Sequence, residues 1–192
     1  MKSREINYEK FRWFFTSNNL LVIGGKSAEQ NEETIPLAEK GDMVVHTKLP
    51  GSPFCIIKSE GQKITDSDIK ETAVFCASFS QQWKKNKKEV EIHVFSPNQI
   101  FKDIKTKKGT FTVVGKSKTI KVKPELWLTI QEKKLRAVPE GAAQEKFFRI
   151  KPGDIPKEKF ARILREKLRG MEINFSEENI LSAIPSGGFA EV

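Results

Sequence analysis

Apolar residues in the first part of the chain form short runs separated by turn residues, as in the strands of a small sheet. Residues 11–16 and 20–23 are two such runs with Ser-Asn-Asn between them, which predicts a β-hairpin. Ser27 stands three positions before Gln30, at the spacing of a capping box, so we expect a short helix that ends near Ile35, before a proline. The chain is therefore expected to begin with a hairpin and a helix.

Two further strands and a longer helix are expected next. Residues 43–46 and 53–58 are apolar runs joined by the turn sequence Leu-Pro-Gly-Ser. Thr65, with Asp68 at the third helical position, predicts the start of a mostly buried helix. Apolar positions at helical spacing extend that helix to Trp83.

Apolar and polar residues alternate in the stretch after this helix. Residues 89–95 alternate strictly, which predicts a strand with His93 on the face opposite to its apolar side chains. Residues 110–114 and 119–122 flank Gly-Lys-Ser-Lys and predict a second hairpin, and residues 126–130 predict a further strand.

The pattern changes at residues 131–143, where apolar periodicity fades and Pro-Glu-Gly interrupts the chain. Residues 146–151 could form a strand. A helix with Pro156 in its first turn follows, and Ser176 caps a last short helix. The apolar face of the first of these helices consists of Phe160, Ile163, Leu164 and Leu168.

These elements predict an α/β (α+β) fold. We expect a mixed, largely antiparallel sheet with two main helices over residues 1–131, and a small helical C-terminal extension, with α/β elements, over residues 132–192. No run approaches the roughly 18 apolar residues needed to cross a bilayer, and the N-terminus lacks the apolar run of a signal peptide. We therefore expect a cytoplasmic protein with no membrane partner.

The sequence offers little for a metal or redox site. Cys55 and Cys76 lie in separate apolar stretches, typical of buried free thiols in a reducing compartment, with a disulfide between them as the alternative. The two histidines are far apart along the chain, so no ligand cluster is apparent. We expect neither a metal nor a cofactor.

Nearly all of the net charge lies in one segment, residues 84–123, which we call the lysine segment. It holds 12 lysines, no arginine and 3 acidic residues, so its formal charge of +9 equals that of the entire chain. Clustered cations bind a polyanion by releasing its counterions, and lysine suits backbone phosphates. The segment thus favours nucleic-acid binding over a basic face that only maintains solubility. The expected phosphate contacts are Lys84, Lys85, Lys87, Lys88, Lys105, Lys107, Lys108, Lys116 and Lys118.

Four short motifs occur in order before this segment. They are Val-Ile-Gly-Gly-Lys at 22–26 with Glu-Gln-Asn-Glu at 29–32, Asp-Met-Val-Val-His at 42–46, Pro-Gly-Ser at 50–52, and Glu-Thr-Ala at 71–73 with Ala77 and Ser80. In their hairpin, helix, strand, strand, helix frame they resemble the RNA-binding domain of the NFACT family, the ribosome-quality-control and fibronectin-binding-protein-like proteins. Lys-Lys-Gly at 107–109 also fits, and the resemblance covers roughly residues 10–125.

The resemblance implies binding to structured RNA, with tRNA on the large ribosomal subunit as the best-known context. The partners it implies are tRNA or ribosomal RNA, and with them the large ribosomal subunit. Full-length members also carry an N-terminal domain, helix-hairpin-helix segments and coiled-coil arms, which have no counterpart in the sequence, so we expect a stand-alone version. Pro53 departs from the family pattern, in which many members have His or another small polar residue.

The motifs add further candidates for RNA contact, each with a structural alternative. Gly24 and Gly25 either make only a tight turn or admit a phosphate at their backbone. His46 is either a fixed structural histidine or stacks on a nucleotide. The full set of candidates outside the lysine segment is Gly24, Gly25, Lys26, Gln30, Asn31, His46, Gly51 and Ser52. The side-chain amides of Gln30 and Asn31 are expected to bond either neighbouring loops or RNA. Pro-Gly-Ser at residues 50–52 is a turn with exposed backbone amides.

Three other functions compete with RNA binding. A DNA-binding module would use the same lysine field, because lysine does not distinguish the two sugars. A ribosome-associated protein-interaction module would dock through the C-terminal extension. Asp42, His46 and Ser52 invite a hydrolase, but their spacing matches no nucleophile elbow, and Gly-Gly-Lys is not a P-loop. We expect a non-catalytic protein.

Overall fold

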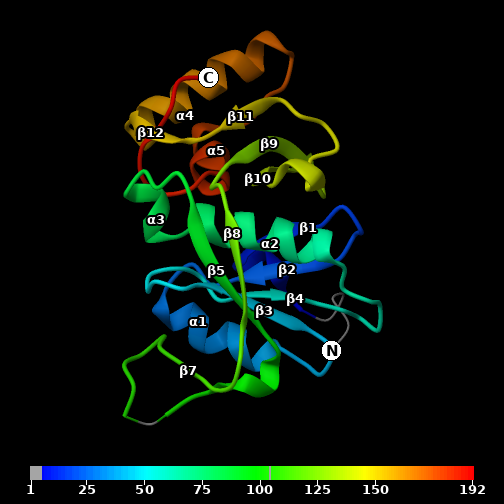
Figure 1. Ribbon diagram of the computed structural model, residues 1–192. Coiled ribbons are helices and arrows are strands. Elements are labelled where there is room, and N and C mark those ends of the chain that lie inside the picture. The colour runs from blue at the N-terminus through cyan, green and yellow to red at the C-terminus, as the bar shows by residue number, and fades with distance from the viewer. Residues whose placement is uncertain (1–5, 104) are drawn as a thin grey trace.

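A six-stranded sheet organises the first part of the chain in the computed structural model, which describes residues 6–103 and 105–192. All neighbouring strands are antiparallel, in the order β1-β2-β4-β3-β5-β8 (Figure 1). Their bounds are β1 Arg12–Phe15, β2 Leu21–Gly24, β3 Met43–Thr47, β4 Cys55–Ile57, β5 Val90–Phe95 and β8 Lys118–Val122. The expected mixed fold with a largely antiparallel sheet is confirmed.

Helices cover both faces of this sheet. One face carries α1 (Ala28–Thr34) and the 3₁₀ turn η3 (Ile35–Leu37), and the other carries α2 (Asp66–Ser78). Because successive strand residues point to opposite faces, Phe14 packs towards α2 while Trp13 packs on the η3 side. The predicted caps are confirmed: Ser27 accepts from the Gln30 N–H group, and Thr65 and Asp68 form a capping box.

The expected single helix to Trp83 is wrong, because the helix is interrupted at Phe79. There α2 ends, and α3 (Gln81–Lys84) starts behind its own cap. The Ser80 hydroxyl donates to the Ala77 carbonyl (2.7 Å) and accepts from the Gln82 N–H group (3.0 Å). A serine that bonds the local backbone in this way competes with helix continuation.

The expected hairpin between residues 110–114 and 119–122 is also wrong. β8 pairs with β5 instead, with Ile120 opposite Ile92, so its apolar side chains extend a face that is already buried. Residues 112–114 are exposed and have no such core to cover. They form β7 (Thr112–Val113), which pairs with β6 (Ile100–Phe101) in a separate two-stranded ribbon.

A second sheet follows in the order β10-β9-β11, with β9 Leu126–Gln131, β10 Lys134–Val138 and β11 Phe148–Ile150. β10 occupies a stretch in which no strand was expected. Its hairpin turns at Glu132 (φ 49°) and Lys133 (φ 60°), residues that lack the usual Asn-Gly signal of a left-handed turn. The expected domain boundary at residue 131 falls inside this hairpin, so we propose a boundary near residue 124.

We call residues 6–123 the N-terminal lobe and residues 124–192 the C-terminal lobe. In the latter, α4 (Lys157–Gly170) buries Phe160, Leu164 and Leu168 while Ile163 is half-buried, and Pro156 is the N-cap residue rather than part of the first turn. α5 (Glu177–Ala183) is capped by Ser176 as expected. The remaining elements are η2 Tyr8–Lys10, η4 Pro97–Gln99, η5 Glu140–Ala142 and β12 Pro152–Ile155.

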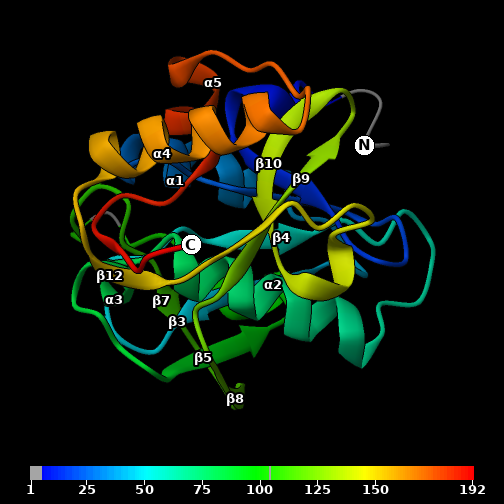
Figure 2. The same ribbon diagram turned by 90° about the horizontal axis from the view of Figure 1, so that it is seen from above.

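The two lobes pack on each other through α2 and the edge of β1. From top to bottom, Figure 1 shows α4, the small sheet, α2, the large sheet and α1, and Figure 2 shows α4 and α5 lying near β9 and β10. Val74 and Phe79 pack against the apolar clusters of both lobes. The Gln131 side chain bonds both the N–H group (2.8 Å) and the carbonyl (2.9 Å) of Phe15. These backbone groups lie at the outer edge of β1, where no further strand of the described chain pairs with them.

Two smaller expectations concern thiols and membranes. Cys55 and Cys76 are buried free thiols, as expected. Burial raises the pKa of Cys55 well above its ordinary value, which keeps this thiol protonated. Among the described residues, no helix is long and apolar enough to span a bilayer.

Candidate nucleic-acid interface

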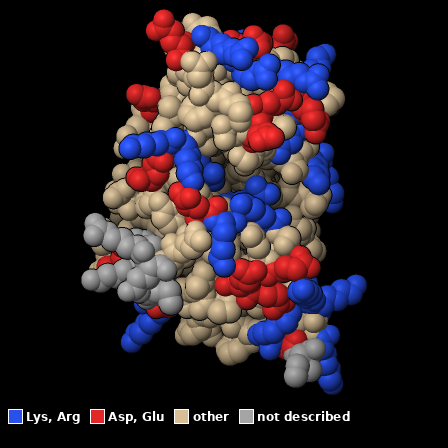
Figure 3. All heavy atoms as spheres, turned by 180° about the vertical axis from the view of Figure 1, so that it is seen from behind, with Lys and Arg blue, Asp and Glu red and all other residues tan. Residues whose placement is uncertain are grey.

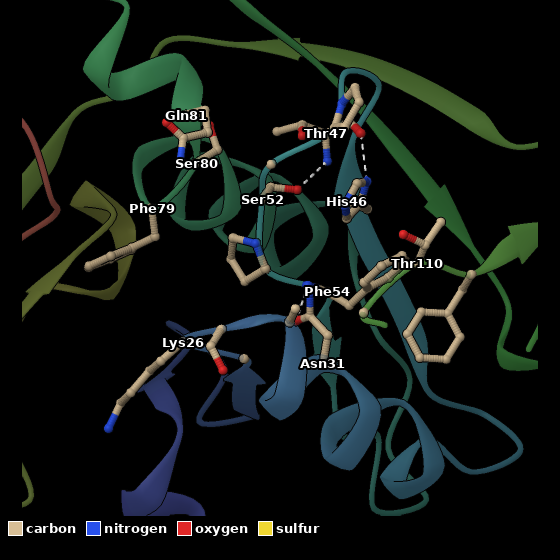
Figure 4. A pocket seen from close by; sticks show the side chains of 18 of the residues that line it. Lys26, Asn31, His46, Thr47, Ser52, Phe54, Phe79, Ser80, Gln81 and Thr110 are labelled. Atoms are coloured by element: carbon tan, nitrogen blue, oxygen red, sulfur yellow. Dashed lines mark hydrogen bonds between the residues drawn. The ribbon is translucent and has the colours of Figure 1, made fainter. Parts of the chain in front are cut away.

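A groove of about 650 Å³ opens where four segments of the N-terminal lobe meet. They are the β2–α1 connection, the β3–β4 loop, the start of α3 and the loop before β7 (Figure 4). Eight of the predicted site residues line it: Gly25, Lys26, Asn31, His46, Gly51, Ser52, Lys84 and Lys108. The fold therefore brings together residues that are far apart in the sequence.

The paired glycines let α1 approach the sheet. A Cβ atom on Gly25 would lie 2.3 Å from the Asn31 side-chain oxygen and 2.9 Å from the Asn31 nitrogen. A Cβ atom on Gly24 would lie 3.0 Å from the Cys55 sulfur. Close packing therefore requires glycine at residue 25, and this packing holds the start of α1 at the wall of the groove.

The two amide side chains of α1 bond neighbouring loops. Asn31 is buried, and its side-chain oxygen accepts from the Phe54 N–H group (3.3 Å), as Figure 4 shows. Gln30 does not line the groove. It accepts from the Lys26 N–H group (2.9 Å) and donates to the Lys10 carbonyl (3.1 Å). These bonds fix the loop that presents Lys26 to the groove.

His46 is a neutral, stacked histidine at the end of β3. Its ring lies 4.2 Å from the Phe54 ring, and its Nδ1 lies 2.6 Å from the Thr47 carbonyl, to which it donates in the matching tautomer (Figure 4). Burial lowers the pKa of His46 to about 4, so the ring carries no charge near neutral pH. His93 stands opposite His46 in the sheet and lines the same groove.

The β3–β4 loop is fixed at both ends. Ser52 is buried, and its hydroxyl accepts from the Thr47 N–H group (3.1 Å). The Gly51 carbonyl accepts from the Gln81 N–H group (2.8 Å), and Gly51 has φ +96°, a conformation that favours glycine. A Cβ atom on Gly51 would lie 2.6 Å from the Gln81 side chain. The loop is thus held against the start of α3.

Glu32 of α1 holds Lys102 and the loop at residues 105–111. The Glu32 carboxylate accepts from Lys102 Nζ (2.6 Å) and from the Gly109 N–H group (2.5 Å). These contacts, led by the Lys102 bond, lower the pKa of Glu32. Lys102 therefore helps to hold this loop in place, whereas Lys105 and Lys107 are exposed to solvent.

The lysine segment does not form one continuous patch. Lys84 and Lys108 line the groove, whereas Lys118 lies 2.9 Å from Asp66 at the start of α2. Lys108 also lies 3.7 Å from Glu29, a distant and exposed pair that contributes little to stability. The other candidates are exposed and make no ion pair among residues 6–103 and 105–192: Lys85, Lys87, Lys88, Lys105, Lys107 and Lys116.

Sequence reasoning missed several residues of the groove. Arg12 lies in β1, with its guanidinium 4.6 Å from the centre of the Phe79 ring. Lys48 and Phe111 line other parts of the wall. A single arginine within an apolar strand carries no pattern of its own, so only the fold reveals its place at the groove.

Comparisons with known proteins fit this arrangement. The NFACT protein RNA binding domain matches residues 10–115, more than half of the chain. The archaeal Rqc2 homolog aRqcH from Methanocaldococcus jannaschii is 31% identical over 192 residues, covering 94% of this chain and 28% of that protein. The human ribosome quality control complex subunit NEMF is 35% identical over 85 residues, covering 43% of this chain and 8% of that protein.

A solved structure shares the fold over part of the chain. It is the C-terminal region of the fibronectin/fibrinogen-binding protein from Streptococcus suis, with a TM-score of 0.52 and 25% identity over 59% of this chain and 45% of that one. The chain spans only about a quarter of the archaeal relative and a smaller share of the human one. The archaeal match also extends past residue 115 into the C-terminal lobe, because it covers 94% of the chain. The predicted family is confirmed: the chain belongs to the NFACT RNA-binding domain family.

Proposed function

We propose that the protein is a non-catalytic RNA-binding protein that recognises structured RNA, either tRNA or ribosomal RNA, in ribosome quality control in the cytoplasm. The groove carries this proposal. Its walls place cations around a neutral histidine and fixed backbone loops, and several segments of the family motif meet there. A folded RNA offers phosphates, sugars and unstacked bases to such a surface.

The groove and the exposed lysines have different roles in this proposal. The lysines at residues 84–88 and 105–108 gain affinity by displacing counterions, regardless of RNA sequence. The groove is shaped by packed glycines and by loops with satisfied hydrogen bonds, so it changes little on binding. In this proposal the groove recognises the shape of the RNA.

The ribosomal context rests on relatives that are much longer than this chain. Their names place them in ribosome quality control, and we extend that context to this chain through the shared domain. In this proposal the large ribosomal subunit is a partner because it presents both tRNA and ribosomal RNA.

The lysine contribution is tested by the double variant Lys107→Gln/Lys108→Gln. We expect RNA affinity to fall about tenfold and the salt slope of log K to decrease by roughly two, because two phosphate contacts are lost. The matched control is Lys40→Gln/Lys63→Gln, which removes two exposed charges outside the lysine segment and outside the groove. An unchanged salt slope in the first variant would remove this loop from the interface.

RNA and DNA are distinguished by competition. A structured RNA hairpin and a DNA hairpin of the same sequence are titrated against a labelled tRNA. We expect the RNA hairpin to compete at a lower concentration, because A-form geometry and the 2′-hydroxyl group are recognised. Equal competition by the two hairpins would favour a general polyanion binder.

A further inference from the structure

A second cavity, of about 460 Å³, lies between the two lobes, and we call it the interlobe cleft. β1 forms one side, and β10 and α5 form the other. Arg12, Lys26 and Phe79 line both the cleft and the groove, so the two cavities adjoin. Seen from behind, the surface is hollowed between the upper and lower parts of the molecule, and basic side chains border the hollow (Figure 3).

Arg136 lines this cleft from β10, and its Nε donor is unpaired among the described residues. Its guanidinium lies 4.4 Å from the centre of the Trp13 ring, and one terminal nitrogen donates to the Trp13 carbonyl (2.7 Å). The Nε atom is buried and has no hydrogen-bond partner within residues 6–103 and 105–192. Covering the edge of β1 therefore uses only part of this side chain, and a buried unpaired donor is costly.

Arg12 faces the same cleft from β1. It stacks on Phe79 and makes no ion pair with any residue that the structure describes. Burial lowers its pKa. Burial and the nearby Arg12 lower the pKa of Arg136 to about 10, and the same two arginines, after burial, lower the pKa of Lys26. The two half-buried arginines and the exposed Lys26 thus repel one another across the cleft.

Among the described residues that line the cleft, one acidic side chain, Glu9, offsets part of this charge at Arg136. The Glu9 carboxylate, however, lies 2.5 Å from Lys134 Nζ. Lys133 adds a further cation to the lining. Charges removed from water are ordinarily paired, so two half-buried arginines without a carboxylate partner of their own in the part of the chain that the structure describes favour an anion supplied from outside.

We propose that the interlobe cleft binds a phosphate group of the bound RNA, with Arg12 and Arg136 as its ligands. The planar guanidinium binds phosphate oxygens through two donors at once, which a lysine ammonium does not do. The cleft continues the groove, so an RNA strand that crosses the groove can place its next phosphates, or its terminal phosphate, between the lobes. This inference rests on the proposed function and assigns the C-terminal lobe a direct part in it.

Arginine side-chain NMR tests the proposal directly. The ¹H–¹⁵N correlations of the Nε groups are assigned with Arg12→Lys and Arg136→Lys variants, and the exposed Arg162 on α4 serves as an internal control. On addition of tRNA we expect the Arg12 and Arg136 signals to move and the Arg162 signal to stay. If backbone signals at Lys107 and Lys108 move while both arginine signals stay, the cleft proposal is overturned but RNA binding stands. If no signal moves with tRNA or with a fragment of ribosomal RNA, RNA binding itself fails and the cleft proposal fails with it.

Inorganic phosphate provides the second arm of this experiment. Movement of both arginine signals with tRNA supports the proposal, whether or not phosphate alone also moves them. Movement with phosphate and not with tRNA overturns it, because the cleft would then be a site for the free anion.

Affinity provides an independent readout. Arg136→Gln is expected to weaken tRNA binding about tenfold and to reduce the salt slope by roughly one, whereas Arg162→Gln changes neither. Arg136→Lys keeps the charge and is expected to lose less affinity than Arg136→Gln. If Arg136→Gln fails to fold, Arg12→Gln carries the same expectation. Wild-type affinity and an unchanged salt slope in folded glutamine variants contradict the proposal.

Discussion

Cations of the lysine segment and cations of the interlobe cleft are held in different ways. Lys85, Lys87 and Lys88 extend into solvent from a turn after α3, whereas Arg136 stacks on Trp13 and buries one of its donors. Mobile surface charges contribute long-range attraction that salt screens, and enclosed charges contribute directional bonds that salt screens less. The net charge of the lysine segment therefore indicates where a polyanion is attracted. Where the polyanion is recognised depends on how the arginines of the cleft are packed.

The two regions also differ in how they tolerate change. Exposed lysines contribute little to folding, and their loss should leave stability nearly unchanged. Groove and cleft residues lie within the packing that joins the elements of the fold. Variants of the lysine segment should therefore lose binding alone, whereas variants of the groove and the cleft should lose both stability and binding.

Gly25→Ala should give the largest change in stability. The added Cβ atom would overlap the Asn31 side-chain oxygen at 2.3 Å and crowd its backbone nitrogen, so α1 must shift. We expect a loss of about 2–4 kcal/mol in the free energy of unfolding, measured by urea denaturation. Gly170→Ala is the control, because no atom lies within 4 Å of its added Cβ atom. An equally stable Gly25→Ala variant would show that the groove wall is not tightly packed.

Replacing Lys84, Lys85, Lys87 and Lys88 together by Gln should give the largest change in binding alone. We expect tRNA affinity to fall about 100-fold or more at low salt, with the slope of log K against log salt reduced by roughly three to four. The unfolding midpoint should remain close to that of the wild type, because these side chains are exposed. A matched variant in which Lys40, Lys63, Lys70 and Lys159 become Gln should retain most of the affinity; equal losses in the two variants would mean that total charge alone matters.

Acid should destabilise the groove through His46. Its folded pKa of about 4 lies below the ordinary value of 6.5, so the unfolded chain takes up the proton first. The stability that the neutral ring contributes is therefore complete above pH 6.5 and decreases by up to about 1.4 kcal/mol per pH unit down to about pH 4. His46→Gln should remove this part of the pH dependence, as measured by denaturation between pH 4 and 8. A variant with the wild-type pH profile would assign the effect to other groups.

Gln131→Ala should give a smaller loss, confined to the contact between the lobes. Gln131 bonds the Phe15 backbone twice and the Ala142 carbonyl once (3.0 Å). We expect stability to fall by about 1–3 kcal/mol, and hydrogen exchange at the edge of β1 to accelerate. Gln144→Ala, at an exposed position, is the control. Unchanged exchange at Phe15 would indicate that the lobes are joined mainly by apolar contacts.

Local signals predicted much of the N-terminal lobe. The first hairpin, the caps at Ser27 and Thr65, and the alternation of β5 all depend on residues close together in the sequence. Pairing over longer distances was less accessible. β8 joins β5 because its apolar residues extend a buried face, and this preference appears only when β5 is already part of a sheet.

The candidate site shows the same limit. Motif spacing predicted His46 and Ser52, and the fold gathers them with Lys84 and Lys108 in one groove. Arg136 could not be predicted, because it belongs to a strand whose turn at Glu132 and Lys133 lacks the usual residues. A charge count also gives no weight to an isolated arginine that becomes important through burial.

Hydrogen–deuterium exchange with and without deacylated tRNA tests most directly whether the groove and the lysine segment form the RNA interface. We expect slower exchange at residues 24–28, 47–52, 84–88 and 105–110, together with β10. Slower exchange confined to residues 144–192, or no change with either tRNA or isolated ribosomal RNA while the chain still associates with ribosomes, would contradict this interface. The second result would favour a C-terminal lobe that docks on protein.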